Sequence, residues 1–174
     1  STHNIFRYDY TVMDGVALKA GYTPSAGTAA VEGSLEYGVH YTGIDGLDIY
    51  AAMGENNDAA NSSDTSMLAA KYTMGAMTIG YQVNDTDFGT GTVDEEASMF
   101  GVSYAVSDDL SVSFNTSTID FEASSKDDQE AQSVSFSHTS GGMTISGSYG
   151  NMDNVNGTAA TDNSAYELNF KFAF

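Results

Sequence analysis

The C-terminal stretch AYELNFKFAF, residues 165–174, decides the fold class of this chain. Large apolar side chains occupy every second position, and Glu167, Asn169 and Lys171 lie between them. Alternation with a period of two places the two sets on opposite faces of a β-strand. The stretch therefore predicts a strand with one apolar and one polar face. Its apolar set is Tyr166, Leu168, Phe170, Phe172 and Phe174.

The same alternation recurs upstream along the chain, and helical periodicity is weak throughout. Tyr, Phe, Val, Ile and Thr dominate the alternating segments, which is typical of strands. We therefore predict an all-β fold with eleven strands. They cover residues 5–11, 16–22, 34–41, 47–53, 66–73, 77–83, 98–105, 110–117, 132–139, 143–149 and 165–174.

The predicted connections alternate between short and long. The short ones are residues 12–15, 42–46, 74–76, 106–109 and 140–142, and their Gly and Asp residues suit hairpin turns. The long ones are residues 23–33, 54–65, 84–97, 118–131 and 150–164. Each hairpin closes with a short turn, and a long loop joins it to the next hairpin. All short turns are therefore expected at one edge of the sheet and all long loops at the other, which predicts an antiparallel up-and-down meander with two unlike rims.

Composition excludes several classes of protein. The chain has 174 residues, with 24 Asp and Glu against 5 Lys and Arg, and a formal net charge of −19. Nucleic-acid binding needs basic residues that neutralise phosphates, so no nucleic-acid partner is expected. The absence of Cys excludes disulfide scaffolds and thiolate metal sites. No apolar run approaches the roughly 20 residues of a transmembrane helix.

Nothing in the sequence indicates an enzyme. The chain lacks the G-x-S-x-G pattern, and its three histidines stand apart from one another. Ser137 and His138 are adjacent in a predicted strand, so their side chains point to opposite faces and cannot act as a nucleophile and base. We predict no catalytic residues.

Two structures share a set of strands with one apolar face. In a sandwich that face points into a core, and in a membrane barrel it points at lipid. Three features favour the barrel: the segregated rims, strands of about 8–10 residues, and aromatic residues near the ends of the apolar stripes, where a bilayer interface attracts them. These aromatic residues are Tyr22, Tyr41, Tyr72, Tyr104 and Tyr149.

Two segments carry a resemblance to a known family. Residues 165–174 resemble the terminal strand of bacterial outer-membrane barrels, in which alternating aromatics and a final Phe are the signal read by the barrel-assembly machinery. Residues 4–11 (NIFRYDYT), a short turn and residues 15–22 (GVALKAGY) resemble a hairpin of Gram-negative general porins. The whole chain is most similar to alphaproteobacterial, Rhodobacter-like porins.

The resemblance implies a transmembrane β-barrel in the outer membrane. Ions and small hydrophilic solutes would cross it passively, without covalent chemistry or a required cofactor. The implied partners are outer-membrane lipid and lipopolysaccharide, two further copies in a homotrimer, and the barrel-assembly machinery. The alternatives are a soluble or surface-exposed β-rich structural or adhesion protein without a pore, and a closed barrel that serves as an anchor or phage receptor without an open pore.

The strand count bears on domain organisation. Bacterial single-chain barrels have even strand numbers with both termini on the short-turn side, whereas eleven is odd. We expect residues 1–174 to be one domain, the C-terminal part of a sixteen-stranded porin that lacks five strands and the constriction loop. The alternative is a miscount, with strand extensions hidden in residues 84–97 or 118–131.

Under the barrel interpretation the polar face lines the pore, where opposed charges contribute to selectivity. The alternative is a set of solvated or locally paired charges without a transport role. The predicted pore-lining residues are Arg7, Asp9, Lys19, Glu36, His40, Asp48, Lys71, Glu167 and Lys171.

Sixteen of the 24 acidic residues fall in the long connections, where they would enrich cations near one rim. A solvated acidic rim is the default interpretation. The alternative is loose binding of Ca²⁺, because oxygen ligands suit this ion. An EF-hand is not expected, since Gly89 and Thr90 break its ligand pattern. The candidate metal ligands are Asp85, Asp87, Asp94, Glu95, Glu96, Asp127, Asp128 and Glu130.

Overall fold

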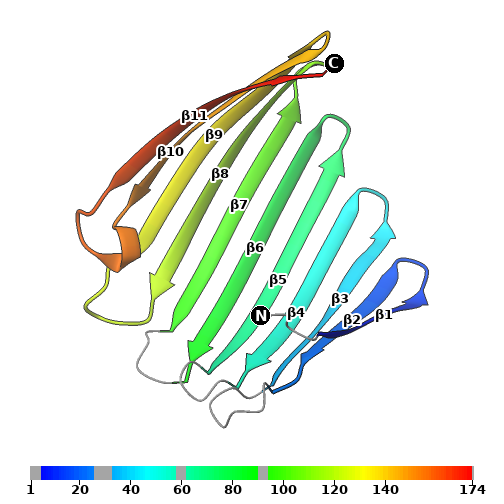
Figure 1. Ribbon diagram of the computed structural model, residues 1–174, viewed down its shortest axis with the longest axis vertical. Coiled ribbons are helices and arrows are strands. Elements are labelled where there is room, and N and C mark those ends of the chain that lie inside the picture. Colours follow the sequence, from blue (N-terminus) through cyan, green and yellow to red (C-terminus); the bar gives the residue numbers. More distant parts are fainter. Residues whose placement is uncertain (1–4, 26–32, 58–61, 90–93, 174) are drawn as a thin grey trace. The chain divides into compact units, whose positions relative to one another are not determined.

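The computed structural model describes residues 5–25, 33–57, 62–89 and 94–173. Eleven antiparallel strands lie in chain order across a sheet (Figure 1), which confirms the all-β prediction. The strands are β1 (Phe6–Met13), β2 (Val16–Thr23), β3 (Ser34–Ile44), β4 (Leu47–Asn56), β5 (Ser63–Met74), β6 (Met77–Phe88), β7 (Glu95–Ala105), β8 (Leu110–Phe121), β9 (Gln129–Ser140), β10 (Met143–Asp153) and β11 (Asn163–Phe172). A 3₁₀ turn, η1 (Val155–Gly157), precedes β11. In the described part of the chain, no helix is long and apolar enough to span a membrane.

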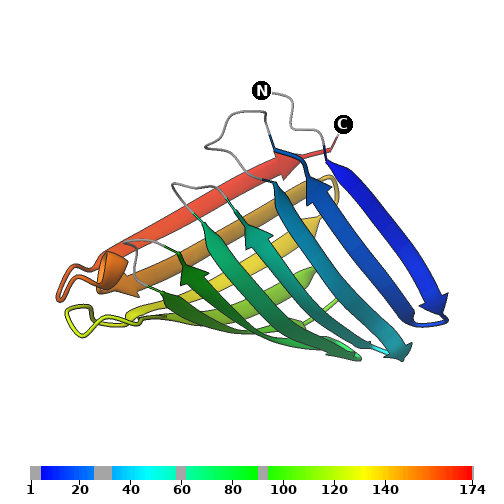
Figure 2. The same ribbon diagram turned by 90° about the horizontal axis from the view of Figure 1, so that it is seen from below.

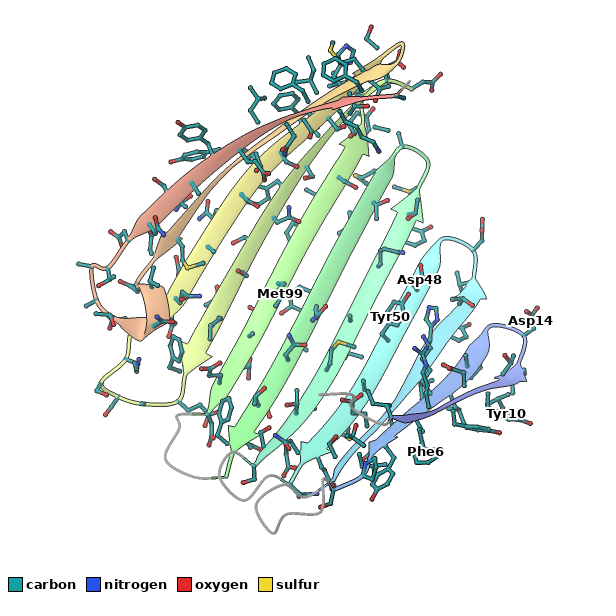
Figure 3. The ribbon with its side chains drawn as sticks, viewed as in Figure 1. Phe6, Tyr10, Asp14, Asp48, Tyr50 and Met99 are labelled. Atoms are coloured by element: carbon teal, nitrogen blue, oxygen red, sulfur yellow. The ribbon has the colours of Figure 1, made fainter. Side chains whose placement is uncertain are left out.

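The chain divides into two compact units, and the first comprises residues 1–70 and 82–96. In this unit Tyr8 of β1 pairs with Ala20 of β2, Ala20 with Tyr37 of β3, and Tyr37 with Met53 of β4. Directly paired residues of antiparallel strands share a face, so these four form one apolar row. Phe6 and Tyr10 project from β1 on that face (Figure 3).

The second unit comprises residues 71–81 and 97–174. Its apolar face contains the row Val112, Phe136, Gly147 and Leu168, which runs across β8, β9, β10 and β11. The Phe136 ring covers Gly147, because a Cβ at Gly147 would lie 2.7 Å from the Phe136 ring. This packing explains why a glycine occupies the middle of β10 in an apolar row.

Neither unit buries a hydrophobic core. Among the described residues no hydrophobic side chain is buried, and Phe114, Tyr149 and Phe170 are 37%, 52% and 56% exposed. Each unit is a single layer of strands (Figure 2). A sandwich needs a second layer over its apolar face, so that arrangement is absent from the parts of the chain described.

The long connections are shorter than predicted, because the strands extend past the alternating apolar residues. Strand β6 continues to Phe88 and β7 begins at Glu95, so most of residues 84–97 is strand. Strands β8 and β9 likewise take up half of residues 118–131. Extensions were foreseen in these two segments, but they lengthen existing strands and add none to the eleven described.

The connection after β8 and the connection after β10 are tied together. Lys126 Nζ donates a hydrogen bond to the Asn156 carbonyl and lies over the Phe121 ring, 5.1 Å from its centroid. Asn154 Nδ2 donates to the Asp128 carbonyl over 3.0 Å. Gly157 fits beneath Lys126 and Phe121, where a Cβ would lie 2.7 Å from Lys126 Cδ. We call these contacts the loop clasp.

Replacing Lys126 with Ala is expected to loosen the loop clasp without unfolding the sheet. The two hydrogen bonds of the clasp are exposed, so the loss in global unfolding free energy should stay under about 1 kcal/mol. Local opening should rise and speed proteolysis within residues 122–128 and 154–162 severalfold. Limited proteolysis with mass spectrometry measures this rate. Glu122→Ala in the same connection is the control, and equal cleavage of both variants would contradict the role of Lys126.

Candidate functional site

The polar face of the first unit carries an ion pair on β1. Arg7 and Asp9 are two residues apart on β1 and therefore point to the same side. Arg7 Nε and Nη2 donate to the two carboxylate oxygens of Asp9 over 2.7 Å and 3.1 Å. This two-point geometry is the strong form of an Arg–carboxylate contact, although both side chains are about half or more exposed.

Lys19 and Glu36 continue the polar face beside this pair. Lys19 of β2 is directly opposite Asp9. Glu36 of β3 lies between Gly21 and Gly54, the residues paired with it on the two flanking strands. Because neither neighbour has a side chain, the Glu36 stem lies over both glycines, within ordinary van der Waals distance of where their Cβ atoms would be.

His40, Asp48 and Tyr50 form a second cluster on this face. His40 Nε2 lies 3.0 Å from Asp48 Oδ1, and both side chains are only about a quarter exposed. The His40 and Tyr50 rings stack with centroids 4.1 Å apart and planes 10° from parallel. Asp48 and Tyr50 project from β4 (Figure 3). Tyr50 was not predicted as a site residue, although its spacing of two from Asp48 places it on the same face.

The polar face of the second unit is mostly neutral. Ser113 of β8 pairs with Ser135 of β9, and their hydroxyl oxygens lie 2.7 Å apart. Thr139 and Thr144 make a similar contact of 3.0 Å near the turn between β9 and β10. Three of the predicted charged residues belong to this unit: Lys71 lies on β5, Glu167 is opposite Ser148, and Lys171 is opposite Thr144.

The structure thus groups some of the predicted pore-lining residues and separates others. It brings together Arg7, Asp9 and Lys19 on β1 and β2, with Glu36 on the adjoining strand, and it joins His40 to Asp48. Lys71 lies on β5, apart from Glu167 and Lys171 on β11. All of them occupy strands, and their role in lining a pore stays a prediction.

The candidate metal ligands do not all lie in loops, and for five of them that placement was wrong. Asp85 and Asp87 belong to β6, Glu95 and Glu96 to β7, and Glu130 to β9. Strand β6 continues through Asp85 and Asp87 because Thr86 and Phe88 alternate with them. The other three, Asp94, Asp127 and Asp128, lie in connections.

The geometry of these acids gives no formed metal centre. In residues 5–25, 33–57, 62–89 and 94–173, no group of three or more Asp, Glu or His side chains comes together to hold an ion. Asp94 Oδ1 instead accepts a hydrogen bond from the Phe88 backbone N–H over 2.7 Å. Binding of Ca²⁺ at this rim stays a prediction.

The residues of the predicted assembly signal form a continuous apolar stripe on β11. Tyr166 is 86% exposed, and Leu168 is 56% exposed. Phe170 and Phe172 continue the stripe toward the turn between β9 and β10, where Phe172 is opposite Met143. Phe174, the last residue of the predicted signal, lies outside the described residues.

A family model described as Gram-negative porin matches residues 1–157. This match spans most of the chain, and the two-faced antiparallel sheet agrees with it. The chain therefore belongs to the Gram-negative porin family, a non-enzymatic family of the outer membrane. No curated protein matches the sequence.

Solved porin structures share the fold. The anion-selective porin from Comamonas acidovorans aligns with a TM-score of 0.82 at 17% identity, over 98% of this chain and 59% of that one. OmpT of Vibrio cholerae gives 0.74 at 17% identity, over 99% and 65%. A mutant of the Rh. blastica porin gives 0.70 at 19% identity, over 98% and 55%. The chain thus spans less than two thirds of each of these structures.

Proposed function

We propose that this chain forms the C-terminal part of the wall of a general-diffusion porin of the Rhodobacter-like kind. Ions and small hydrophilic solutes would cross the outer membrane passively through its water-filled barrel. The observation that carries the proposal is the exposed apolar face, which no other layer covers among the described residues of either unit, opposite a face of charged and hydroxyl side chains. Lipid suits the first face and water the second.

The proposal extends to assembly and surroundings. The barrel-assembly machinery would recognise the aromatic stripe of β11, and the mature protein would form a homotrimer surrounded by lipid and lipopolysaccharide. The carboxylates at the strand extensions would attract cations at the mouth. A surface-exposed β-rich protein without a pore is the competing function, and family membership favours the porin.

Conductance of the complete protein tests this function. Purified protein in a planar bilayer should produce stepwise increases in ionic current, and the folded form should migrate differently from the heated form on a detergent gel. The contrary result is a heat-modifiable barrel that inserts into the bilayer and passes no current. That result would favour an anchor without a pore.

Ion selectivity should respond to the wall charges. The predicted pore-lining set contains four basic residues (Arg7, Lys19, Lys71 and Lys171) and four acidic ones (Asp9, Glu36, Asp48 and Glu167), so its formal charge is balanced. Lys19→Glu is expected to move the reversal potential toward cation selectivity. The shift should shrink in 1 M salt, where the Debye length falls to about 3 Å.

A graded series gives this prediction its control. Lys19→Gln removes one charge and should give about half the shift of Lys19→Glu, which changes the charge by two. Reversal potentials are measured in a salt gradient across a planar bilayer. A reversal potential that is unchanged in both variants at low salt would mean that Lys19 does not face the permeation path.

A further inference from the structure

We propose that the polar face of the second unit is a weak binding surface for neutral polyhydroxylated solutes, namely sugars and polyols. The inference rests on the proposed porin function, because it names a class of solute that the wall favours. Its starting point is an open concavity of about 670 Å³. That volume falls in the range of small-molecule sites, roughly 300–1,000 Å³.

The strand registers arrange the lining of this concavity as a grid. Across β8, β9, β10 and β11, one row consists of Ser111, Ser137, Ser146 and Asn169, and the next of Ser113, Ser135, Ser148 and Glu167. Neighbouring positions lie about 4.8 Å apart across the strands and about 6.8 Å apart along them. We call these eight residues the hydroxyl grid. A sugar ring therefore spans two or more of its positions at once.

The chemistry of the hydroxyl grid matches that of a sugar. Each Ser hydroxyl both donates and accepts hydrogen bonds, as sugar hydroxyls do. The approach of the Ser113 and Ser135 oxygens to 2.7 Å places two such groups within reach of one solute hydroxyl. On β11, Glu167 only accepts, while the Asn169 amide does both, and their spacing of two residues aims them to the same side.

The shortage of charge on the hydroxyl grid argues for a neutral solute. Only Glu167 among its eight residues is ionised. The polar face of the first unit instead carries the Arg7–Asp9 ion pair and Lys19. A neutral polyol exchanges water contacts for contacts with the serines at little cost, so binding is weak and quickly reversible. Fast release is what permeation requires.

Current noise in the complete channel tests the proposal. Sucrose should add excess noise to the ionic current, because bound sugar briefly obstructs the path. Polyethylene glycol of matched hydrodynamic radius should lower the current without this noise, since its ether oxygens accept but do not donate hydrogen bonds. Excess noise gives an apparent dissociation constant for sucrose. Equal effects of both solutes, set by size alone, would overturn the inference.

Variants locate the effect on the hydroxyl grid. The quadruple replacement Ser111→Ala, Ser113→Ala, Ser135→Ala and Ser137→Ala should raise the sucrose dissociation constant roughly tenfold. The control, Thr139→Val with Thr144→Val, removes two hydroxyls of the same unit outside the concavity and should change it less than about twofold. An unchanged constant in the quadruple variant would overturn the proposal.

A milder variant covers the case in which the quadruple variant does not fold. Glu167→Ala removes one acceptor and should weaken sucrose binding roughly threefold. An unchanged constant in this variant would overturn the proposal in the same way. Wild-type protein that gives no ionic current before sugar is added would instead overturn the porin function itself, so the two failures are distinguishable.

Discussion

The complete protein carrying Leu168→Arg is expected to fail to insert stably into membranes, whereas the neighbouring variant Asn169→Arg should insert normally. The two positions are consecutive on β11 and therefore face opposite sides. Leu168 is 56% exposed in the apolar row with Gly147 and Phe136. Asn169 lies in the concavity on the other face.

The size of the expected effect follows from the medium on each side. An Arg on the lipid face near the bilayer midplane costs about 2–4 kcal/mol, while an Arg in a water-filled lumen keeps its hydration. Leu168 sits in the middle of the apolar stripe of β11, between Tyr166 and Phe172, so the full cost applies. The substitution should therefore lower the free energy of unfolding of the barrel by a large part of its total.

Urea titration of refolding into lipid vesicles measures this difference, with heat-modifiable gel mobility as the readout of the folded form. Asn169→Arg serves as the control for adding a long cation to β11. Equal folding of the two variants would mean that both faces of β11 meet water, which would remove the basis of the porin proposal.

Gly15→Ala should be the most damaging of the turn substitutions, at about 3 kcal/mol or more, from positive-φ strain plus overpacking. Gly15 has φ of +75°, and a Cβ there would lie 2.6 Å from Gly43 Cα. The approach is fixed by the Thr42 backbone N–H, which donates to the Gly15 carbonyl over 2.7 Å. The obstruction is backbone and cannot rotate away.

Gly75→Ala separates the two causes. Gly75 also sits in a short turn with positive φ, +58°, but nothing lies within 4 Å of where its Cβ would be. Its replacement should cost only the conformational strain, about 1–2 kcal/mol. Urea unfolding midpoints of both variants give the comparison. A Gly15→Ala midpoint equal to that of Gly75→Ala would show that the chain relaxes around Gly43.

Much of this fold could be predicted, because period-two alternation leaves little choice of face. In β11 the even-numbered residues from Tyr166 to Phe172 define the apolar side, and the odd-numbered residues from Glu167 to Lys171 define the polar side. The registers keep that division across four strands. The positions of the short turns followed from their Gly and Asp residues. The strand ends near the long connections were harder to predict. Polar residues such as Asp85 and Asp87 continue a strand without any change in the alternation, so the sequence does not mark where the strand ends.

The candidate site could be predicted only in part. Alternation placed His40 and Asp48 on the polar face, but their contact depends on the register between β3 and β4, which pairs His40 with Tyr50. That register is set by the turn between the strands and by a bulge after Tyr41. The loop clasp was also unforeseen, since Lys126 and Asn156 meet across 30 residues of sequence.

The pairing of every strand with its neighbour in the chain also bears on how the sheet forms. Each addition of a strand closes only one turn or one connecting segment, and the entropy lost in closing such segments grows slowly with their length. Growth can therefore proceed hairpin by hairpin along the chain, without waiting for remote segments to meet. A strand that fails to join leaves its predecessor as an unpaired edge, and unpaired edges promote aggregation.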